Sequence, residues 1–241
     1  IAERKQVKNT TTNNKSPKTP VVNAIGDCAG LGVDGGWGVW EASTANFLNG
    51  NITWLTSGLP PTGPRFNLTS GAGIDPCTPG AGAGSPTIPV VAPGFGTASI
   101  QMGQQRTNGF SGGCSLGCIE RLTYSLLVSP SDTNFVYAFA LIFENPSQGH
   151  KKQESPYAEI YMTDLAGDTI DCSYNKYMGD TTGAVPFGKY TAICAGGGSG
   201  GGVAYQPWTI VGINLSNYVN QVVKAVSYTH LRAHETKANL V

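Results

Sequence analysis

Three glycine-rich motifs match patterns that hold phosphates or activate a nucleophile. Residues 30–35 have the Gly-x-Gly-x-x-Gly spacing of dinucleotide-binding proteins, but no helix that could hold a pyrophosphate is predicted after them. Residues 183–189 match a phosphate loop, but Tyr190 stands where a magnesium-binding Ser or Thr is required. Residues 109–113 match a nucleophile elbow around Ser111, but a predicted strand follows instead of a helix. We interpret residues 30–35 as a turn, residues 183–189 as a chance near miss, and residues 109–113 as lacking the strand–turn–helix context of a nucleophile elbow.

Acid–base chemistry has few candidates. His150 is the one histidine before residue 226, and it lies in a polar inter-strand loop beside Lys151 and Lys152, which disfavour its charged form without orienting it. We interpret four acids as exposed turn residues rather than as a facing carboxylate pair: Asp164, Asp168, Asp171 and Asp180. The sequence therefore predicts a protein that is not an enzyme.

Two kinds of binding residue stand out. Tyr174 and Tyr177 lie in a polar Ser-Tyr-Asn-Lys-Tyr segment, where exposed rings could stack on a sugar; Trp208, which opens an apolar strand, is predicted to be core. We expect no cofactor. A structural calcium ion is the one metal role that the loops suggest, with Asp34 as its ligand, although no Asp-x-Asp-x-Asp loop is present.

The chain has six cysteines, an even number. They favour a disulfide framework and hence an exported protein. A zinc site is the alternative, but residues 114–118 have no second ligand pair to complete it. The disulfide candidates are Cys28, Cys77, Cys114, Cys118, Cys172 and Cys194.

Alternating apolar residues predict strands rather than helices. Residues 119–129 alternate with one apolar face, and residues 133–144 are apolar on both faces, as in a strand covered on both sides. Further predicted strands are 98–102, 157–162, 169–172, 190–194, 208–215 and 219–223. Residues 57–97 are predicted to be a long, structured surface loop rich in Gly and Pro.

These elements predict the fold class. Strands separated by turns, without a helical apolar stripe, favour an all-β fold, an antiparallel jelly-roll-like β-sandwich. Charged residues make up 12% of the chain and apolar residues 40%, which suits neither a helical bundle nor a disordered polymer.

Charge and hydropathy exclude two partner classes. Residues 21–225 hold eight basic and thirteen acidic residues, a formal charge of about −5, which disfavours nucleic acid. No run of eighteen apolar residues occurs, so we expect no membrane insertion.

The two ends differ from the middle. Residues 1–23 are polar and read as a linker or arm. Residues 226–241 break the Gly-rich β composition and resemble the translation of a sequencing-library adapter, so we predict a non-native tail. His230 and His234, which a helical metal pair could use, then lose that role. The module itself is predicted to span residues 24–225.

Several segments, in a constant order, carry a family resemblance: 35–38, 70–77, 88–94 with 99–103, 120–125, 135–146, 158–161, 205–208 and 214–219. Together they resemble an N-terminal β-sandwich module of large secreted proteins of gliding bacteria, which often carry PKD-type repeats and a gliding-motility-associated, type IX secretion C-terminal domain.

The resemblance implies a secreted or cell-surface, non-catalytic module for adhesion or ligand display, with a polysaccharide or a cell-surface protein as the extracellular ligand. The alternative is a carbohydrate-binding module attached to a secreted enzyme. In the family further strands follow residue 223, so the resemblance implies a sandwich truncated at its last strands, with an unpaired edge and with Cys172 lacking its partner. Asp34 departs from the family's Phe-Glu, which weakens its metal role.

Overall fold

The computed structural model describes residues 23–24, 40–48, 51–58, 65–79, 87–103, 118–145, 155–179, 188–190, 202–231 and 236–240. The strands within these residues are β1 (Asn23–Ala24), β2 (Glu41–Leu48), β3 (Asn51–Gly58), β4 (Phe66–Ser70), β5 (Ile74–Pro79), β6 (Thr87–Pro89), β7 (Ala98–Met102), β8 (Cys118–Leu127), β9 (Asn134–Asn145), β10 (Tyr157–Thr163), β11 (Asn175–Met178), β12 (Gly188–Tyr190), β13 (Gly202–Asn214), β14 (Val222–Leu231) and β15 (Thr236–Leu240). A short 3-10 turn, η3 (Ser216–Tyr218), leads into β14.

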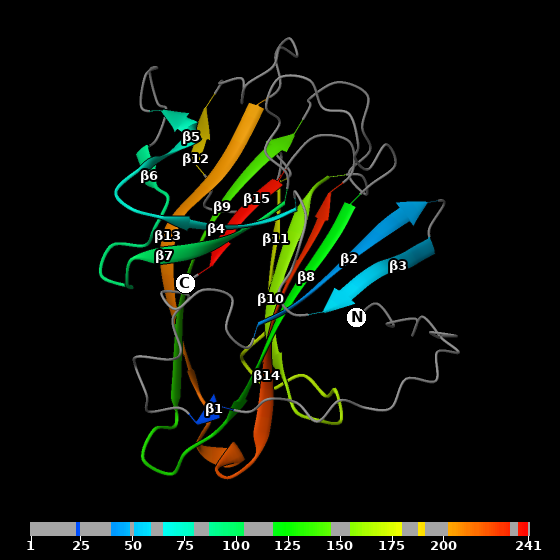
Figure 1. Cartoon of the computed structure of the whole chain (residues 1–241), viewed down its shortest axis with the longest axis vertical. Helices are drawn as coiled ribbons and strands as arrows, with labels where there is room; N and C mark the ends of the chain where they lie inside the picture. The colour runs from blue at the N-terminus through cyan, green and yellow to red at the C-terminus, as the bar shows by residue number, and fades with distance from the viewer. Residues whose placement is uncertain are drawn as a thin grey trace.

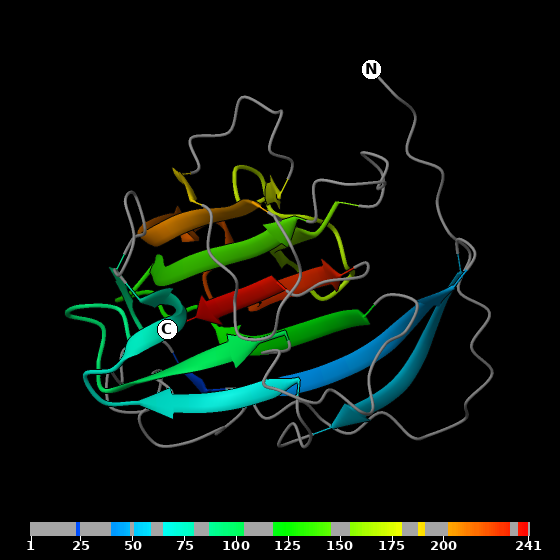
Figure 2. The ribbon, with the colours of Figure 1, turned by 90° about the horizontal axis from the view of Figure 1, so that it is seen from above.

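Two sheets face each other. Sheet A has the order β11-β10-β14-β8-β2-β3, with β1 also paired to β8, and sheet B has the order β12-β13-β9-β15-β7-β4. Figure 1 shows sheet B on the left and sheet A on the right, and Figure 2 shows the layers from above. All pairings are antiparallel except the short one between β1 and β8. The predicted all-β sandwich is therefore confirmed.

The core fills the space between the sheets. On β8, Leu122, Tyr124 and Leu126 are buried against sheet B, while Arg121 and Thr123 lie on the outer face. This is the alternation that the sequence predicts, because successive side chains of a strand point to opposite faces.

Strand β9 is buried on both faces, as predicted. Phe139 and Leu141 join the main core, while Ile142 packs outside sheet B against Ile88 of β6. Trp208 covers this smaller cluster, and its indole Nε1–H donates to the Pro89 carbonyl at 2.8 Å. The β5–β6 hairpin thus supplies the second cover that the apolar outer face of β9 requires.

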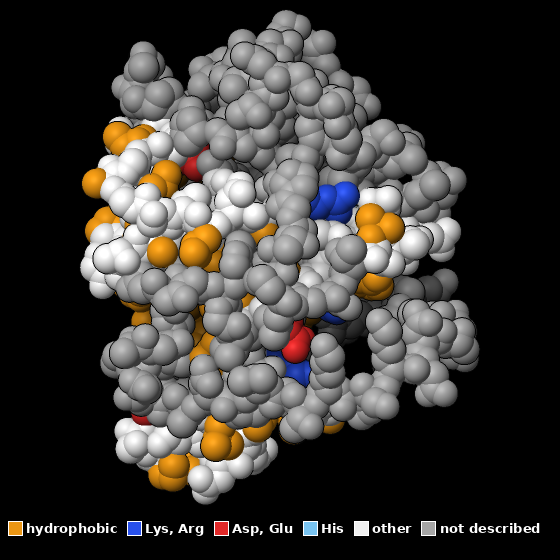
Figure 3. All heavy atoms as spheres, viewed as in Figure 1, with side chains coloured by type: hydrophobic (Ala, Val, Ile, Leu, Met, Phe, Trp, Pro, Cys, Tyr) orange, Lys and Arg blue, Asp and Glu red, His pale blue; other side chains and the backbone are white. Residues whose placement is uncertain are grey.

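Three predicted elements are wrong in part. Of the predicted strand 219–223 only Val222 and Val223 belong to a strand, because Asn220 has a left-handed φ of 61° in the turn before β14. Residues 169–172 form no strand: Thr169 makes an isolated bridge to Thr163, and Cys172 has a left-handed φ of 61°, which a strand cannot accommodate. The predicted loop 57–97 instead contains β4, the edge strand of sheet B, and the β5–β6 hairpin. In Figure 3 hydrophobic side chains gather on the left, over the region where Figure 1 places β5, β6 and β7.

The predicted tail lies inside the fold. Residues 226–231 continue β14 between β10 and β8, and residues 236–240 form β15 between β9 and β7. The expectation of an open edge at this point is therefore wrong, because these segments supply backbone partners within both sheets. Their resemblance to a translated adapter remains a prediction from the sequence.

Within the described ranges, the structure has no helix long and apolar enough to cross a membrane.

Candidate ligand-binding groove on sheet A

The outer face of sheet A carries polar and aromatic side chains in register. Because paired residues of adjacent strands point to the same face, the pairings place them in rows across β10, β14, β8 and β2. Three consecutive rows are Glu159–Tyr228–Arg121–Ser43, Tyr161–Val226–Thr123–Glu41 and Thr163–Lys224–Ser125. This face therefore assembles side chains from four strands that lie far apart in the sequence.

A groove of about 620 Å³ runs over these rows. One side is formed by the segment that connects β10 to β11, which contributes Gly167, Thr169 and Tyr174. Its other lining residues are Glu41, Arg121, Thr123, Glu159, Tyr161, Thr163, Lys224 and Val226. Most of these side chains can donate or accept hydrogen bonds, as a ligand rich in hydroxyl groups requires.

The connecting segment is held by its own hydrogen bonds. The Asp168 backbone N–H donates to Asp164 Oδ1 at 2.9 Å, and Gly167 has a φ of 91° that favours glycine. The buried Ser173 hydroxyl donates to the Ile170 carbonyl at 2.6 Å. Asp164 and Asp168 are thus turn residues, as predicted.

Two tyrosines line the groove. Tyr174 is 40% exposed, and its ring centroid lies 6.0 Å from that of Tyr161, with the planes at 44°. The Tyr174 hydroxyl donates to Glu159 Oε1 at 2.9 Å. Aromatic rings fixed in this way offer apolar faces beside polar groups, which is what stacking on a sugar ring needs.

Charged side chains are arranged around these rings. Glu159 also pairs with Lys176 of β11 through an N–O distance of 2.9 Å. The Arg121 guanidinium lies 4.2 Å from the centroid of the Trp54 ring, a cation–π contact, and its Nη2 donates to Ser43 Oγ at 3.5 Å. Lys224 is half-buried on the groove floor.

An aromatic ladder borders the groove. Tyr157 stacks on Tyr228 at 6.1 Å and contacts His230 at 4.8 Å between ring centroids. The Tyr157 hydroxyl lies 3.1 Å from His230 Nδ1. Burial, reinforced by the Glu159 charge, raises the pKa of Tyr157 to about 12, and burial also raises the pKa of Tyr228. Both tyrosines therefore stay neutral hydrogen-bonding groups at ordinary pH.

The structure separates the two tyrosines that the sequence grouped. Tyr174 lines the groove, but Tyr177 points into the core, where its ring centroid lies 5.0 Å from that of Phe139. Tyr161, Arg121 and Lys224 were not singled out from the sequence. Their outward positions follow from alternation, but their common location follows from strand pairing.

Several predicted site residues lie outside what the structure describes. Asp34 is one of them, so the calcium prediction is untested; within the described residues no group of three or more His, Cys, Asp or Glu could hold a metal ion. Cys28, Cys114 and Cys194 also lie outside the described residues, as do His150, Ser111 and His234. Cys77 and Cys118 lie on β5 and β8. Cys172 is exposed and its thiol is free, so the disulfide framework stays a prediction.

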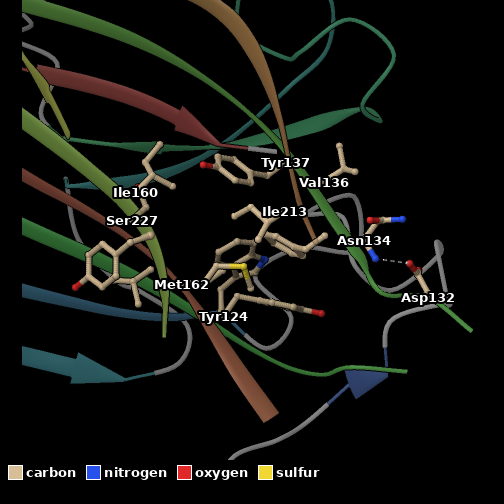
Figure 4. Close-up of a pocket in the computed structure, with 14 residues that line it drawn as sticks. Tyr124, Asp132, Asn134, Val136, Tyr137, Ile160, Met162, Ile213 and Ser227 are labelled. Carbon is tan, nitrogen blue, oxygen red and sulfur yellow. Dashed lines mark hydrogen bonds between the residues drawn. The ribbon is translucent and has the colours of Figure 1, made fainter. Parts of the chain in front are cut away.

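A second cavity, of about 200 Å³, lies between the sheets. Figure 4 shows Tyr124, Tyr137, Met162 and Ile213 around it, with Asp132 and Asn134 to one side. The Ser227 side chain is 2% exposed, lines this cavity and has no hydrogen-bond partner among the described residues. Its lining is mostly apolar, so this cavity suits a polar ligand less well than the groove does.

One carboxyl group is enclosed in the sandwich. Glu120 is fully buried, accepts a hydrogen bond from the Thr229 hydroxyl at 2.5 Å, and lies 3.8 Å from Arg65 Nε. Arg65 is held by donation to the Ala45 carbonyl at 3.1 Å. Burial outweighs these contacts and raises the Glu120 pKa to about 7. Glu120 does not line the groove, so it has no role there.

Comparison with known proteins adds little to this geometry. No family model matches the chain, and no curated protein matches it. Among solved structures, the chain is similar to that of TmCBM61 in complex with β-1,4-galactotriose, with 9% identity over 73% of this chain and 87% of that chain, and a TM-score of 0.30.

Proposed function

We propose that this protein is a non-catalytic β-sandwich module that binds a carbohydrate in the groove on the outer face of sheet A. The observation that carries the proposal is the placement of the exposed Tyr174 ring beside Tyr161, above a floor of hydrogen-bonding side chains. Saccharides present alternating apolar ring faces and hydroxyl edges, and a groove of this composition matches both. A polysaccharide ligand also fits the adhesive, cell-surface role that the family resemblance implies.

Binding is tested with immobilised and soluble polysaccharides by affinity electrophoresis and calorimetry. Tyr174→Ala is expected to weaken binding about tenfold, since it removes a stacking face worth about 1 kcal/mol beyond its buried area. Tyr174→Phe keeps the ring and loses only the hydroxyl, which donates a hydrogen bond to Glu159. This variant is expected to retain most of the affinity.

Two matched controls isolate the groove. Leu165→Ala truncates a side chain that is 59% exposed in the same connecting segment but does not line the groove, so binding should not change. Tyr177→Phe alters the tyrosine that packs against the core, so it should likewise leave binding unchanged. Equal loss of binding in Leu165→Ala and Tyr174→Ala, or no binding to any polysaccharide, would contradict the proposal.

A further inference from the structure

Resting on the proposed function, we infer that the saccharide is acidic: it carries anionic groups, uronate carboxylates or sulfate esters, that Arg121 and Lys224 bind. Both side chains line the groove. In the described part of the chain, neither makes an ion pair. The ligand class follows from how each cation is held.

Lys224 stands on the groove floor. It lies on β14 between Thr163 and Ser125, which are neutral, and it is half-buried. Its ammonium group has no carboxylate partner in the described part of the chain, so it can form a charge-assisted hydrogen bond with an anionic group of a bound ligand.

Arg121 is oriented before any ligand arrives. The Trp54 ring covers one face of its guanidinium at 4.2 Å, and Ser43 accepts from Nη2 at 3.5 Å. Its Nε is shielded from solvent, so a ligand can reach only the Nη groups. A guanidinium fixed in this way presents its terminal N–H groups to a carboxylate or sulfate, whose oxygens can accept from them.

The acidic side chains of the groove do not cancel these charges. Glu159 is already engaged by Lys176 and by the Tyr174 hydroxyl, each at 2.9 Å. Glu41 is exposed at the opposite end of the row that contains Tyr161. The groove therefore has two cations, Arg121 and Lys224, and one carboxylate that is not ion-paired, Glu41. The charge of Glu41 opposes binding of an anion.

The strand register sets the length of the ligand. Arg121 and Lys224 lie on neighbouring strands, two rows apart, so their Cα atoms are separated by about 14 Å. The row between them contains Tyr161 and Val226. A ligand that contacts both cations must cross this row, so it is an oligosaccharide rather than a single sugar.

The test compares a trigalacturonate with its methyl ester, which has the same rings without the charges, by calorimetry at low and high salt. The acid is expected to bind about tenfold more tightly than the ester, and added salt should remove most of the difference. A sulfated oligosaccharide in a parallel titration distinguishes carboxylate from sulfate as the preferred anion.

Substitutions of Lys224 and Glu41 should change the affinity for the acid in opposite directions. Lys224→Gln should weaken binding of the acid about tenfold and leave the ester unchanged, while Glu41→Gln should strengthen binding of the acid. Asp171→Asn makes the same charge change as Glu41→Gln at an exposed residue that does not line the groove, and should have little effect. If Lys224→Gln disturbs folding, the Glu41→Gln result and the salt dependence decide.

The outcomes separate the two claims. Equal binding of acid and ester, with loss in Tyr174→Ala, would overturn the acidic ligand and leave carbohydrate binding standing. Lack of binding to acidic and neutral saccharides alike would overturn both.

Discussion

Replacing Glu120 by Gln should change how the stability of the protein depends on pH. Glu120 is fully buried, and the hydrogen bond from Thr229 and the charge of Arg65 compensate only part of the cost of burying a carboxylate. The pKa of Glu120 is therefore raised from 4.5 to about 7 in the folded protein. In the unfolded chain the carboxyl group ionises near its ordinary pKa.

The direction in which stability changes with pH follows from proton binding to Glu120. Between pH 4.5 and about 7 the folded state holds a proton on Glu120 that the unfolded state has lost, so stability falls as pH rises. Below this window Glu120 is protonated in both states and has no effect; above it the full penalty applies. A shift of about 2.5 pKa units corresponds to about 3 kcal/mol of unfolding free energy.

Denaturant unfolding at several pH values from 4.5 to 8 measures this effect. Glu120→Gln keeps an amide oxygen that can accept from Thr229 but cannot ionise, so its stability should lack the loss of about 3 kcal/mol that the native protein shows across the window. Glu159→Gln removes a carboxyl group from the surface and should keep the native slope. The reasoning is refuted if Glu120→Gln and the native protein show the same pH dependence.

Three further predictions concern packing and backbone geometry. Ser227→Ala removes a buried hydroxyl without a partner and should raise the unfolding free energy by about 1 kcal/mol, measured by denaturant midpoint; a loss would show that the hydroxyl is satisfied. Phe139→Ala should cost about 3–5 kcal/mol in the same assay, against less than about 1 kcal/mol for Val136→Ala, which is 51% exposed on the same strand; equal costs would contradict the assigned core. Cys172 should react rapidly with a thiol reagent in the native protein, and Cys172→Gly should stabilise by about 1 kcal/mol because glycine tolerates its φ of 61°; slow labelling would contradict the exposed, unpaired thiol.

Local patterns were sufficient for the strands with the strongest alternation. On β9 the run of apolar residues on both faces required a cover on each side. The structure supplies sheet A on one face and Ile88 with Trp208 on the other. The pattern failed at residues 169–172, a short run of β-favouring residues that lies in a turn. The Ser173 hydroxyl stabilises this turn by a hydrogen bond, and Cys172 has a left-handed backbone conformation. Backbone conformation there depends on hydrogen bonds that periodicity does not report.

The two tyrosines illustrate the same limit. Tyr174 and Tyr177 look equivalent when residues 173–177 are interpreted as a loop, but β11 begins at Asn175. Once the strand forms, Tyr177 shares its inward face with Asn175, and Lys176 lies on the outer face beside Glu159. Recognition of this short strand would have placed Tyr177 in the core, since alternation is a local property.

The sequence by itself determined the fold class and the alternation of the long strands, because these depend on residue types and on spacings within one element. The groove was decided by the tertiary structure. Arg121 and Lys224 are distant in the sequence and share a face because β14 pairs with β8 in one particular register. Register is fixed by burying the apolar face of each strand between the sheets, an interaction among all strands that no single segment encodes.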